Sequence, residues 1–153
     1  MVRNGLISLA SSRSAWLGYE YYKETKVINY KQTNENEYEA TVAGSDENRY
    51  HVFLNIKNPR FSKCGCSFAK DRRIICKHLV ALFFTIFPGE VDKYLKEIEK
   101  SKREAEKWEK ELHEKVEKYV KSLSKEELKV ALMEILYSSN DWIFDRFVRD
   151  RIY

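Results

Sequence analysis

The chain has 153 residues, of which 43% are hydrophobic and 34% are charged, and its formal net charge is +4. This length and composition suit one compact domain, or a small domain with an extension. No run of eighteen apolar residues occurs, which excludes a membrane-spanning helix. The start of the chain also lacks the apolar segment of a signal peptide, so we expect a cytoplasmic, reducing environment.

The first half of the chain is expected to form one helix and three strands. Residues 14–24 have helical spacing and many aromatic side chains. These rings could stack on nucleic-acid bases, but at this spacing they are more typical of a core. From Lys26 the apolar period changes to two, which predicts a strand, a turn at residues 34–37 and a second strand from Tyr38. A third strand is predicted at residues 50–56.

The next segment contains every cysteine of the chain and one histidine: Cys64, Cys66, Cys76 and His78. Three thiolates and one imidazole form the closed, tetrahedral ligand set typical of structural zinc, which leaves no position for a catalytic water. We expect Gly65 to give the backbone freedom for a tight turn at the end of a strand. Cys76 and His78 should lie in the first turn of a helix, whose positive end favours thiolates. The sequence therefore predicts a zinc site that stabilises the fold.

The cysteines have other interpretations. One disulfide and a spare thiol would suit an oxidising compartment, but the number is odd and no secretory signal is present. A redox role usually requires a C-x-x-C motif, which is absent. Inert buried cysteines are common, yet three of them beside a histidine at this spacing favour a metal. His51 is an additional candidate ligand, although structural zinc is almost always four-coordinate.

The second half of the chain is expected to be helical. Residues 79–87 are mostly apolar and predict a buried helix that ends at the following Pro-Gly pair. Residues 90–121 predict a long helix that is dense in lysine and glutamate and carries one apolar stripe. A capping box at residues 124–127 starts another helix, and Asn140 or Asp141 caps the last one.

The apolar stripe of the long helix has two interpretations. Its members are mostly three or four residues apart: Val91, Tyr94, Leu95, Ile98, Ala105, Trp108, Leu112, Val116, Tyr119 and Val120. Such a stripe usually folds back onto its own domain, but it also suits partner binding or dimerisation. The last two helices form a hairpin with an apolar face of its own, which must pack on the long helix, on the zinc module or on another molecule.

Positive charge is concentrated around the cysteines. Residues 49–78 contain eight basic residues and a single acidic one, Asp71. Five of the basic side chains are candidates for contacts with the phosphates of a nucleic acid: Lys63, Lys70, Arg72, Arg73 and Lys77. Alternatively, basic neighbours only offset the negative charge of a zinc ion held by three thiolates. One or two side chains would be enough for that purpose.

The C-x-C and C-x-H pairs, with a variable loop between them and apolar residues after the histidine, resemble the prokaryotic SWIM zinc finger. The likeness extends upstream to residues 18–22, 26–27, 42–45 and 50–52. It covers roughly residues 14–87, with a weaker likeness at residues 122–148. The resemblance implies a small ββα-like zinc module that binds DNA or other proteins and has no family-wide catalytic activity. It also implies a partner such as a recombinase paralogue in DNA recombination or repair.

The expected fold is α+β. Residues 1–89 should form a small antiparallel β-meander and a zinc-pinned, SWIM-like helix, and residues 90–153 a long charged helix followed by a C-terminal helical hairpin. The expected function is binding of nucleic acid, DNA in particular, around the zinc loop. The alternative is a protein-interaction adaptor, for a recombinase paralogue or as a dimer through the extension. We do not expect an enzyme, because no Gly-rich phosphate loop, H-E-x-x-H helix or nucleophile motif occurs.

Overall fold

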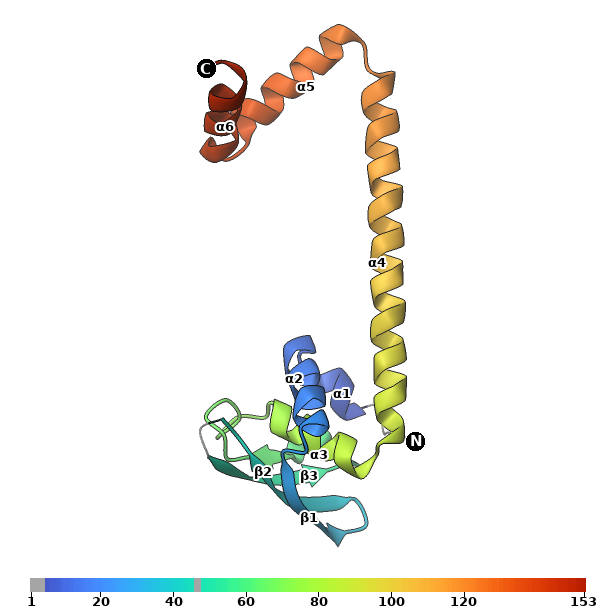
Figure 1. Cartoon of the computed structure of the whole chain (residues 1–153), viewed down its shortest axis with the longest axis vertical. Helices are drawn as coiled ribbons and strands as arrows, with labels where there is room; N and C mark the ends of the chain where they lie inside the picture. The colour runs from blue at the N-terminus through green and yellow to red at the C-terminus, as the bar shows by residue number, and fades with distance from the viewer. Residues whose placement is uncertain (1–4, 46–47) are drawn as a thin grey trace. The chain divides into compact units, whose positions relative to one another are not determined.

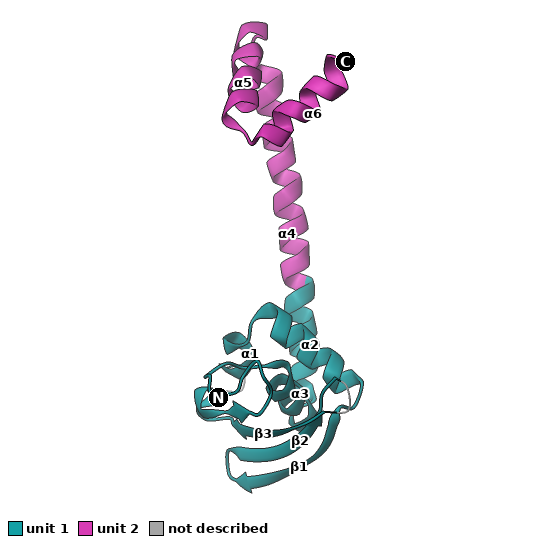
Figure 2. Ribbon diagram, turned by 90° about the vertical axis from the view of Figure 1, so that its left-hand side faces the viewer, with its two compact units in different colours: residues 1–99 teal, residues 100–153 magenta. Residues whose placement is uncertain are grey.

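The structure is a computed structural model of the chain and describes residues 5–45 and 48–153 (Figure 1). Two compact units are present, Met1–Glu99 and Lys100–Tyr153, and the division falls within helix α4 (Gly89–Ser122) (Figure 2). The first unit combines helices with a sheet and the second is helical, which confirms the predicted α+β fold. Within the described residues, no helix has both the length and the apolar composition that crossing a membrane would require.

The first unit contains an antiparallel sheet with the strand order β1-β2-β3-β4. The strands are β1 (Val27–Asn34), β2 (Glu37–Ala43), β3 (Arg49–Asn55) and β4 (Lys63–Cys64). The predicted meander of three strands is therefore confirmed, and the short strand β4 extends it. Since Cys64 pairs with Val52 of β3, the meander holds the first cysteine at the edge of the sheet.

The two faces of the sheet differ in burial. On β3, Val52 and Leu54 have no exposed surface. His51 is exposed and Phe53 is half-buried, because successive side chains of a strand point to opposite faces. The strand predicted at residues 50–56 is therefore confirmed as β3. One face of β3 forms the core, and the other carries His51 and Phe53 at the surface.

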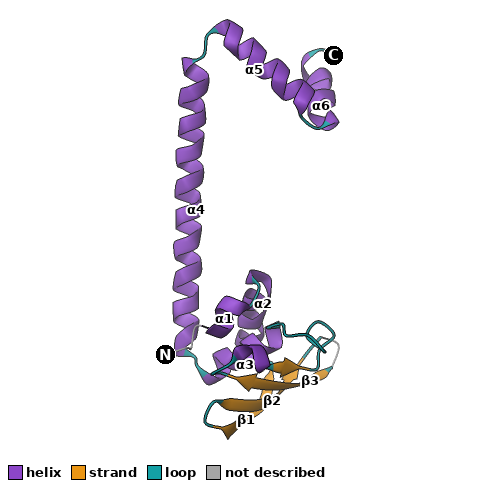
Figure 3. Ribbon diagram, turned by 180° about the vertical axis from the view of Figure 1, so that it is seen from behind, coloured by secondary structure: helices purple, strands orange, loops and turns teal. Residues whose placement is uncertain are grey.

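Three helices of the first unit lie on the core face of the sheet (Figure 3). They are α1 (Gly5–Leu9), α2 (Ser12–Lys23) and α3 (Lys77–Ile86). Each residue from Leu79 to Phe84 has 0% exposure. A helix that is apolar on all sides must be covered on all sides, and α3 is covered by α2 and by the sheet. The predicted buried helix is confirmed, whereas the sequence pattern did not reveal the five-residue helix α1.

The aromatic residues of α2 have different environments. Tyr19, Tyr21 and Tyr22 pack against the core of the first unit. Trp16 lies at the surface, with 42% of its side chain exposed. The core interpretation therefore applies to the three tyrosines and not to Trp16.

Helices α2 and α3 approach each other closely at Gly18. A Cβ atom on Gly18 would lie 2.4 Å from Cβ of Val80 and 2.9 Å from the carbonyl oxygen of Lys77. We expect Gly18→Ala to push the helices apart and to lower the free energy of unfolding by about 1–3 kcal/mol, measured by denaturant unfolding. Gly65→Ala is the matched control, because its Cβ would meet only the carbonyl oxygen of His51, at 3.8 Å. Equal losses in both variants would contradict this packing.

The second unit contains the remainder of α4, α5 (Lys125–Ser138) and α6 (Asp141–Arg151). The predicted capping box is confirmed: Ser124 Oγ accepts from the backbone N–H of Glu127, and Glu127 Oε2 accepts from that of Ser124 at 2.7 Å. Asn140 is the N-cap residue of α6, although its side chain makes no capping hydrogen bond. Tyr137 of α5 and Phe144 of α6 pack together, with ring centroids 5.8 Å apart.

The predicted stripe of α4 has two environments. Near the start of the helix, Val91, Tyr94 and Leu95 pack against the core of the first unit. Further along, five members of the stripe are exposed: Trp108, Leu112, Val116, Tyr119 and Val120. Six large apolar residues of the following helix are exposed as well: Leu128, Val130, Leu132, Met133, Ile135 and Tyr137. Within the first unit, the expectation that the stripe folds back onto its own domain is confirmed.

Candidate metal centre

The structure brings the four predicted zinc ligands together. Their ligand atoms lie within 4.8 Å of one another, and each residue is at most 5% exposed. His78 Nδ1 is 3.6 Å from Sγ of Cys64 and 3.8 Å from Sγ of Cys76. A tetrahedral zinc ion with Zn–S bonds of about 2.3 Å and a Zn–N bond of about 2.0 Å needs ligand atoms about 3.5–3.8 Å apart. These two distances fit zinc.

Two structural elements hold the ligands. Cys76 is the N-cap residue of α3 and His78 lies in its first turn, as predicted. On the other side, the backbone N–H of Gly65 donates to the carbonyl oxygen of His51 at 3.1 Å. The expectation for Gly65 was wrong, since no glycine among the described residues has a positive φ angle. The C-x-C turn is instead held by its pairing with β3, in a conformation open to other residues.

The protonation of the thiols shows why the site needs a cation. The hydrogen bond to Cys76, together with burial, raises the pKa of the Cys64 thiol. Burial and the nearby charge of Cys76 raise the pKa of Cys66. The hydrogen bond from Cys64 lowers the pKa of Cys76 to about 4 despite burial, and His78 adds to this effect. The metal-free cluster therefore favours one thiolate, whereas a zinc ion stabilises three.

The imidazole of His78 is oriented by aromatic rings. Nδ1 faces the thiols, so coordination through Nδ1 leaves the proton on Nε2. Nε2 is buried and has no hydrogen-bond partner among the described residues. The ring centroids of Tyr21 and Tyr50 lie 5.4 and 4.7 Å from that of His78. Their packing takes the place of the hydrogen-bond acceptor that usually orients a ligating histidine.

Comparison with known families agrees with this geometry. The sequence model of the SWIM zinc finger matches residues 50–87, from β3 to the end of α3, and includes all four ligands. The chain carries a SWIM zinc finger. Zinc is its metal, as the donor set and the matched family both require. No curated protein and no solved structure matches the chain.

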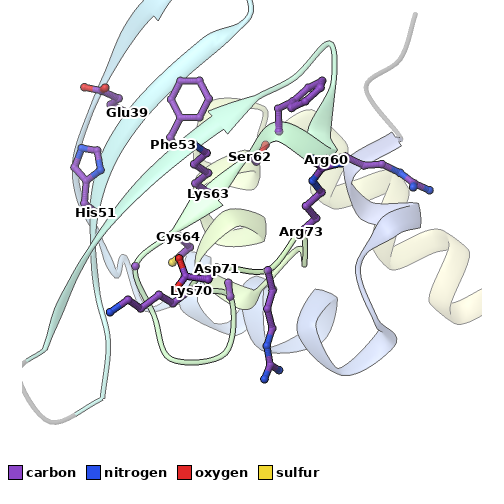
Figure 4. Close-up of a pocket in the computed structure, with 14 residues that line it drawn as sticks. Glu39, His51, Phe53, Arg60, Ser62, Lys63, Cys64, Lys70, Asp71 and Arg73 are labelled. Carbon is purple, nitrogen blue, oxygen red and sulfur yellow. The ribbon is translucent and has the colours of Figure 1, made fainter.

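A cleft of about 810 Å³ lies on the SWIM finger and is lined in part by the loop at residues 67–75 that joins the two ligand pairs (Figure 4). Five exposed basic residues line this basic cleft: Arg60, Lys63, Lys70, Arg72 and Arg73. Within the described part of the chain, none of the five forms an ion pair with a carboxylate. Two acidic residues also line the cleft: Glu39, which is paired with Lys31 at 3.1 Å, and Asp71. The basic cleft therefore carries excess positive charge.

The basic cleft includes four of the five predicted phosphate contacts. Lys77 lies elsewhere, with its Nζ 4.3 Å from the centroid of the Tyr21 ring. Arg60 belongs to the cleft but was not among the five. It lies in the 3₁₀ turn η1 (Pro59–Phe61), just before the strand that pairs with β3. Its only signal in the sequence was its place in the basic segment 49–78.

The zinc site and the basic cleft share the ligand loop. Each end of the loop adjoins a ligand, Cys66 on one side and Cys76 on the other. Inside the loop, Ala69 and Ile75 are each only 3% exposed, and Ala69 N–H donates to the Cys66 carbonyl oxygen at 3.0 Å. Zinc binding therefore fixes both ends of the segment that carries three of the five cations of the cleft.

Proposed function

We propose that the SWIM finger binds nucleic acid, DNA in particular, through the basic cleft. The observation that carries this proposal is the set of five cations around one cleft, none of which has an acidic partner among the described residues. Arginine and lysine side chains that are free of internal ion pairs can pair with phosphate oxygens. The contacts to phosphate are made by Arg60, Lys63, Lys70, Arg72 and Arg73.

The charge of the zinc site does not account for these cations. A zinc ion with three thiolates carries a local charge of about −1. The thiols are almost fully buried, whereas all five cations are exposed. One side chain would balance the site, so most of the positive charge remains for an external anion. The three cysteines form no disulfide, which supports a reducing, cytoplasmic location as part of the proposal.

Phosphate contacts predict binding that depends strongly on salt and weakly on base sequence. Fluorescence anisotropy of a labelled DNA strand, titrated with the zinc-loaded protein at several salt concentrations, tests this. Five phosphate contacts on a single strand should give a slope of about −3.5 in a plot of log K against log salt concentration. Absence of binding at low salt would remove the nucleic-acid function.

A second function, that of a protein-interaction adaptor, is favoured by the exposed apolar residues of the second unit. Trp108 is 65% exposed, Val116 53% and Tyr119 64%. Large exposed apolar patches often mark sites of protein association. The partner proposed for this surface is a recombinase paralogue in DNA recombination or repair, or a second copy of the chain.

The adaptor function predicts a specific response to charge on α4. Leu112→Lys with Val116→Lys should abolish binding of a recombinase paralogue from the same organism, measured by calorimetry, and should abolish any dimer seen by light scattering. Arg72→Ala with Arg73→Ala is the control and should leave both kinds of association unchanged. A monomeric wild-type protein that gives no binding heat would rule the adaptor function out.

A further inference from the structure

Aromatic side chains share the basic cleft with the cations. Phe53 and Phe61 both line it, together with His51. Figure 4 shows His51 and Phe53 on β3, with Lys63 next to Phe53. The sheet places Phe53 and Lys63 next to each other, because the two residues are directly paired across β3 and β4. A phosphate-binding cation and an aromatic ring therefore stand side by side in the cleft.

Phe61 is exposed on an ordered turn. Its side chain is 57% exposed, although the turn that carries it is ordered by hydrogen bonds. The backbone N–H of Phe61 donates to the carbonyl oxygen of Asn58 at 2.9 Å. The next residue, Ser62, is buried and its Oγ accepts from the backbone N–H of Asn55 at 3.0 Å. The backbone that carries Phe61 is thus ordered, and the ring is exposed to solvent.

Neither phenylalanine ring takes part in the aromatic contacts that the structure describes. In the described residues, no aromatic pair and no cation–π contact includes Phe53 or Phe61. The tyrosines around the core, in contrast, pair with other rings, as Tyr22 does with Phe84. Single exposed apolar residues are common on protein surfaces. Two such rings in a cleft with five cations that form no ion pair in the described residues are a more specific arrangement. The rings match the base of a nucleotide, and the cations match its phosphate.

We infer that the nucleic acid in the basic cleft is single-stranded and that its bases stack on Phe61 and Phe53. This inference rests on the proposed nucleic-acid function and specifies its ligand. A phenylalanine ring has no hydrogen-bonding group with which to read base edges. It can stack on the flat face of a base, and that face is accessible only in an unstacked strand. In a duplex the same rings would meet only the backbone.

The test compares three labelled probes of equal length with the zinc-loaded full chain: a single strand, the same strand with abasic sites, and a duplex. Base stacking on aromatic side chains changes affinity by about 5- to 150-fold per base. The single strand should therefore bind at least about 5-fold more tightly than the abasic strand. Deoxyribose and ribose versions of the single strand show which of the two nucleic acids is preferred, and the inference holds for either.

Variants separate stacking from charge. Phe61→Ala should weaken binding of the single strand by about 5-fold or more and leave binding of the abasic strand unchanged. Phe68→Ala is the matched control, since Phe68 is 51% exposed and does not line the basic cleft. Phe53→Val, which retains a strand-forming residue, gives an independent second variant. Zinc content is measured for each variant.

The outcomes distinguish this inference from the function on which it rests. Equal affinity for the three probes, with no effect of Phe61→Ala or Phe53→Val, would overturn the single-strand inference and leave nucleic-acid binding intact. An equal loss for Phe68→Ala and Phe61→Ala would also overturn it. If none of the probes binds at low salt, the proposed function fails and the inference fails with it.

Discussion

Cys66→Ser or His78→Ala is expected to abolish zinc binding and to unfold residues near 50–87. Structural zinc can contribute about 10 kcal/mol or more of apparent binding free energy in small modules, enough to decide whether they fold. Here the four ligands join the end of the sheet to the first turn of α3. Zinc content per chain, hydrogen exchange of residues 50–87 and the helical circular dichroism signal measure the effect.

The helical signal should fall only in part, because α5, α6 and most of α4 belong to the second unit. His51→Ala is the matched control for the histidine variant. It lies in the strand next to the site but is not part of the four-residue cluster, so it should retain zinc. A Cys66→Ser protein that keeps the wild-type zinc content and full thermal stability would refute the zinc site.

Arg72→Ala with Arg73→Ala is expected to make nucleic-acid binding less sensitive to salt. Both residues line the basic cleft and neither has an acidic partner in the described part of the chain. Each lost phosphate contact should reduce the slope of log K against log salt concentration by about 0.7 on a single strand. The double variant should therefore bind with a slope that is about 1.4 smaller in magnitude than that of the wild type.

The control for this prediction has the same change in charge at a different place. Lys110→Ala with Lys115→Ala removes two exposed positive charges from α4, and we expect the wild-type slope. If both double variants reduce the slope equally, binding depends on net charge and not on the basic cleft. An unchanged slope for the arginine variant would remove Arg72 and Arg73 from the proposed contacts.

The zinc site was predictable because its information is local. Ligand type and spacing indicate zinc without knowledge of the tertiary structure. In the same way, the continuous apolar sequence before Phe87 predicted that α3 is buried. The explanation for Gly65 failed, because a glycine between two ligands can also adopt a conformation that any residue allows.

The composition of the basic cleft was less predictable. Arg60 enters the cleft through the turn η1 and the pairing of β4 with β3, which brings together segments from different parts of the sequence. Lys77 is equally basic and adjacent to a ligand, but the orientation of the first turn of α3 places it over Tyr21. Charge counts along the sequence show that a segment is basic, whereas the fold decides which side chains share a surface.

The apolar stripe of α4 shows a similar limit. Its spacing correctly predicted a long amphipathic helix, since the period of apolar residues reports one face of a helix. The same period does not specify what covers that face. Val91 is buried with the first unit, whereas Trp108 on the continuation of the stripe is exposed.

The measurement that tests the account most directly is chelator titration of the complex between the protein and a labelled single strand. Zinc release is followed with a chromogenic indicator, and the bound fraction of the strand is followed by anisotropy. Because Cys66 and Cys76 fix both ends of the loop that carries Lys70, Arg72 and Arg73, we expect the strand to dissociate in step with zinc release. Added zinc should restore binding. Binding that persists after all the zinc has been removed would contradict the account.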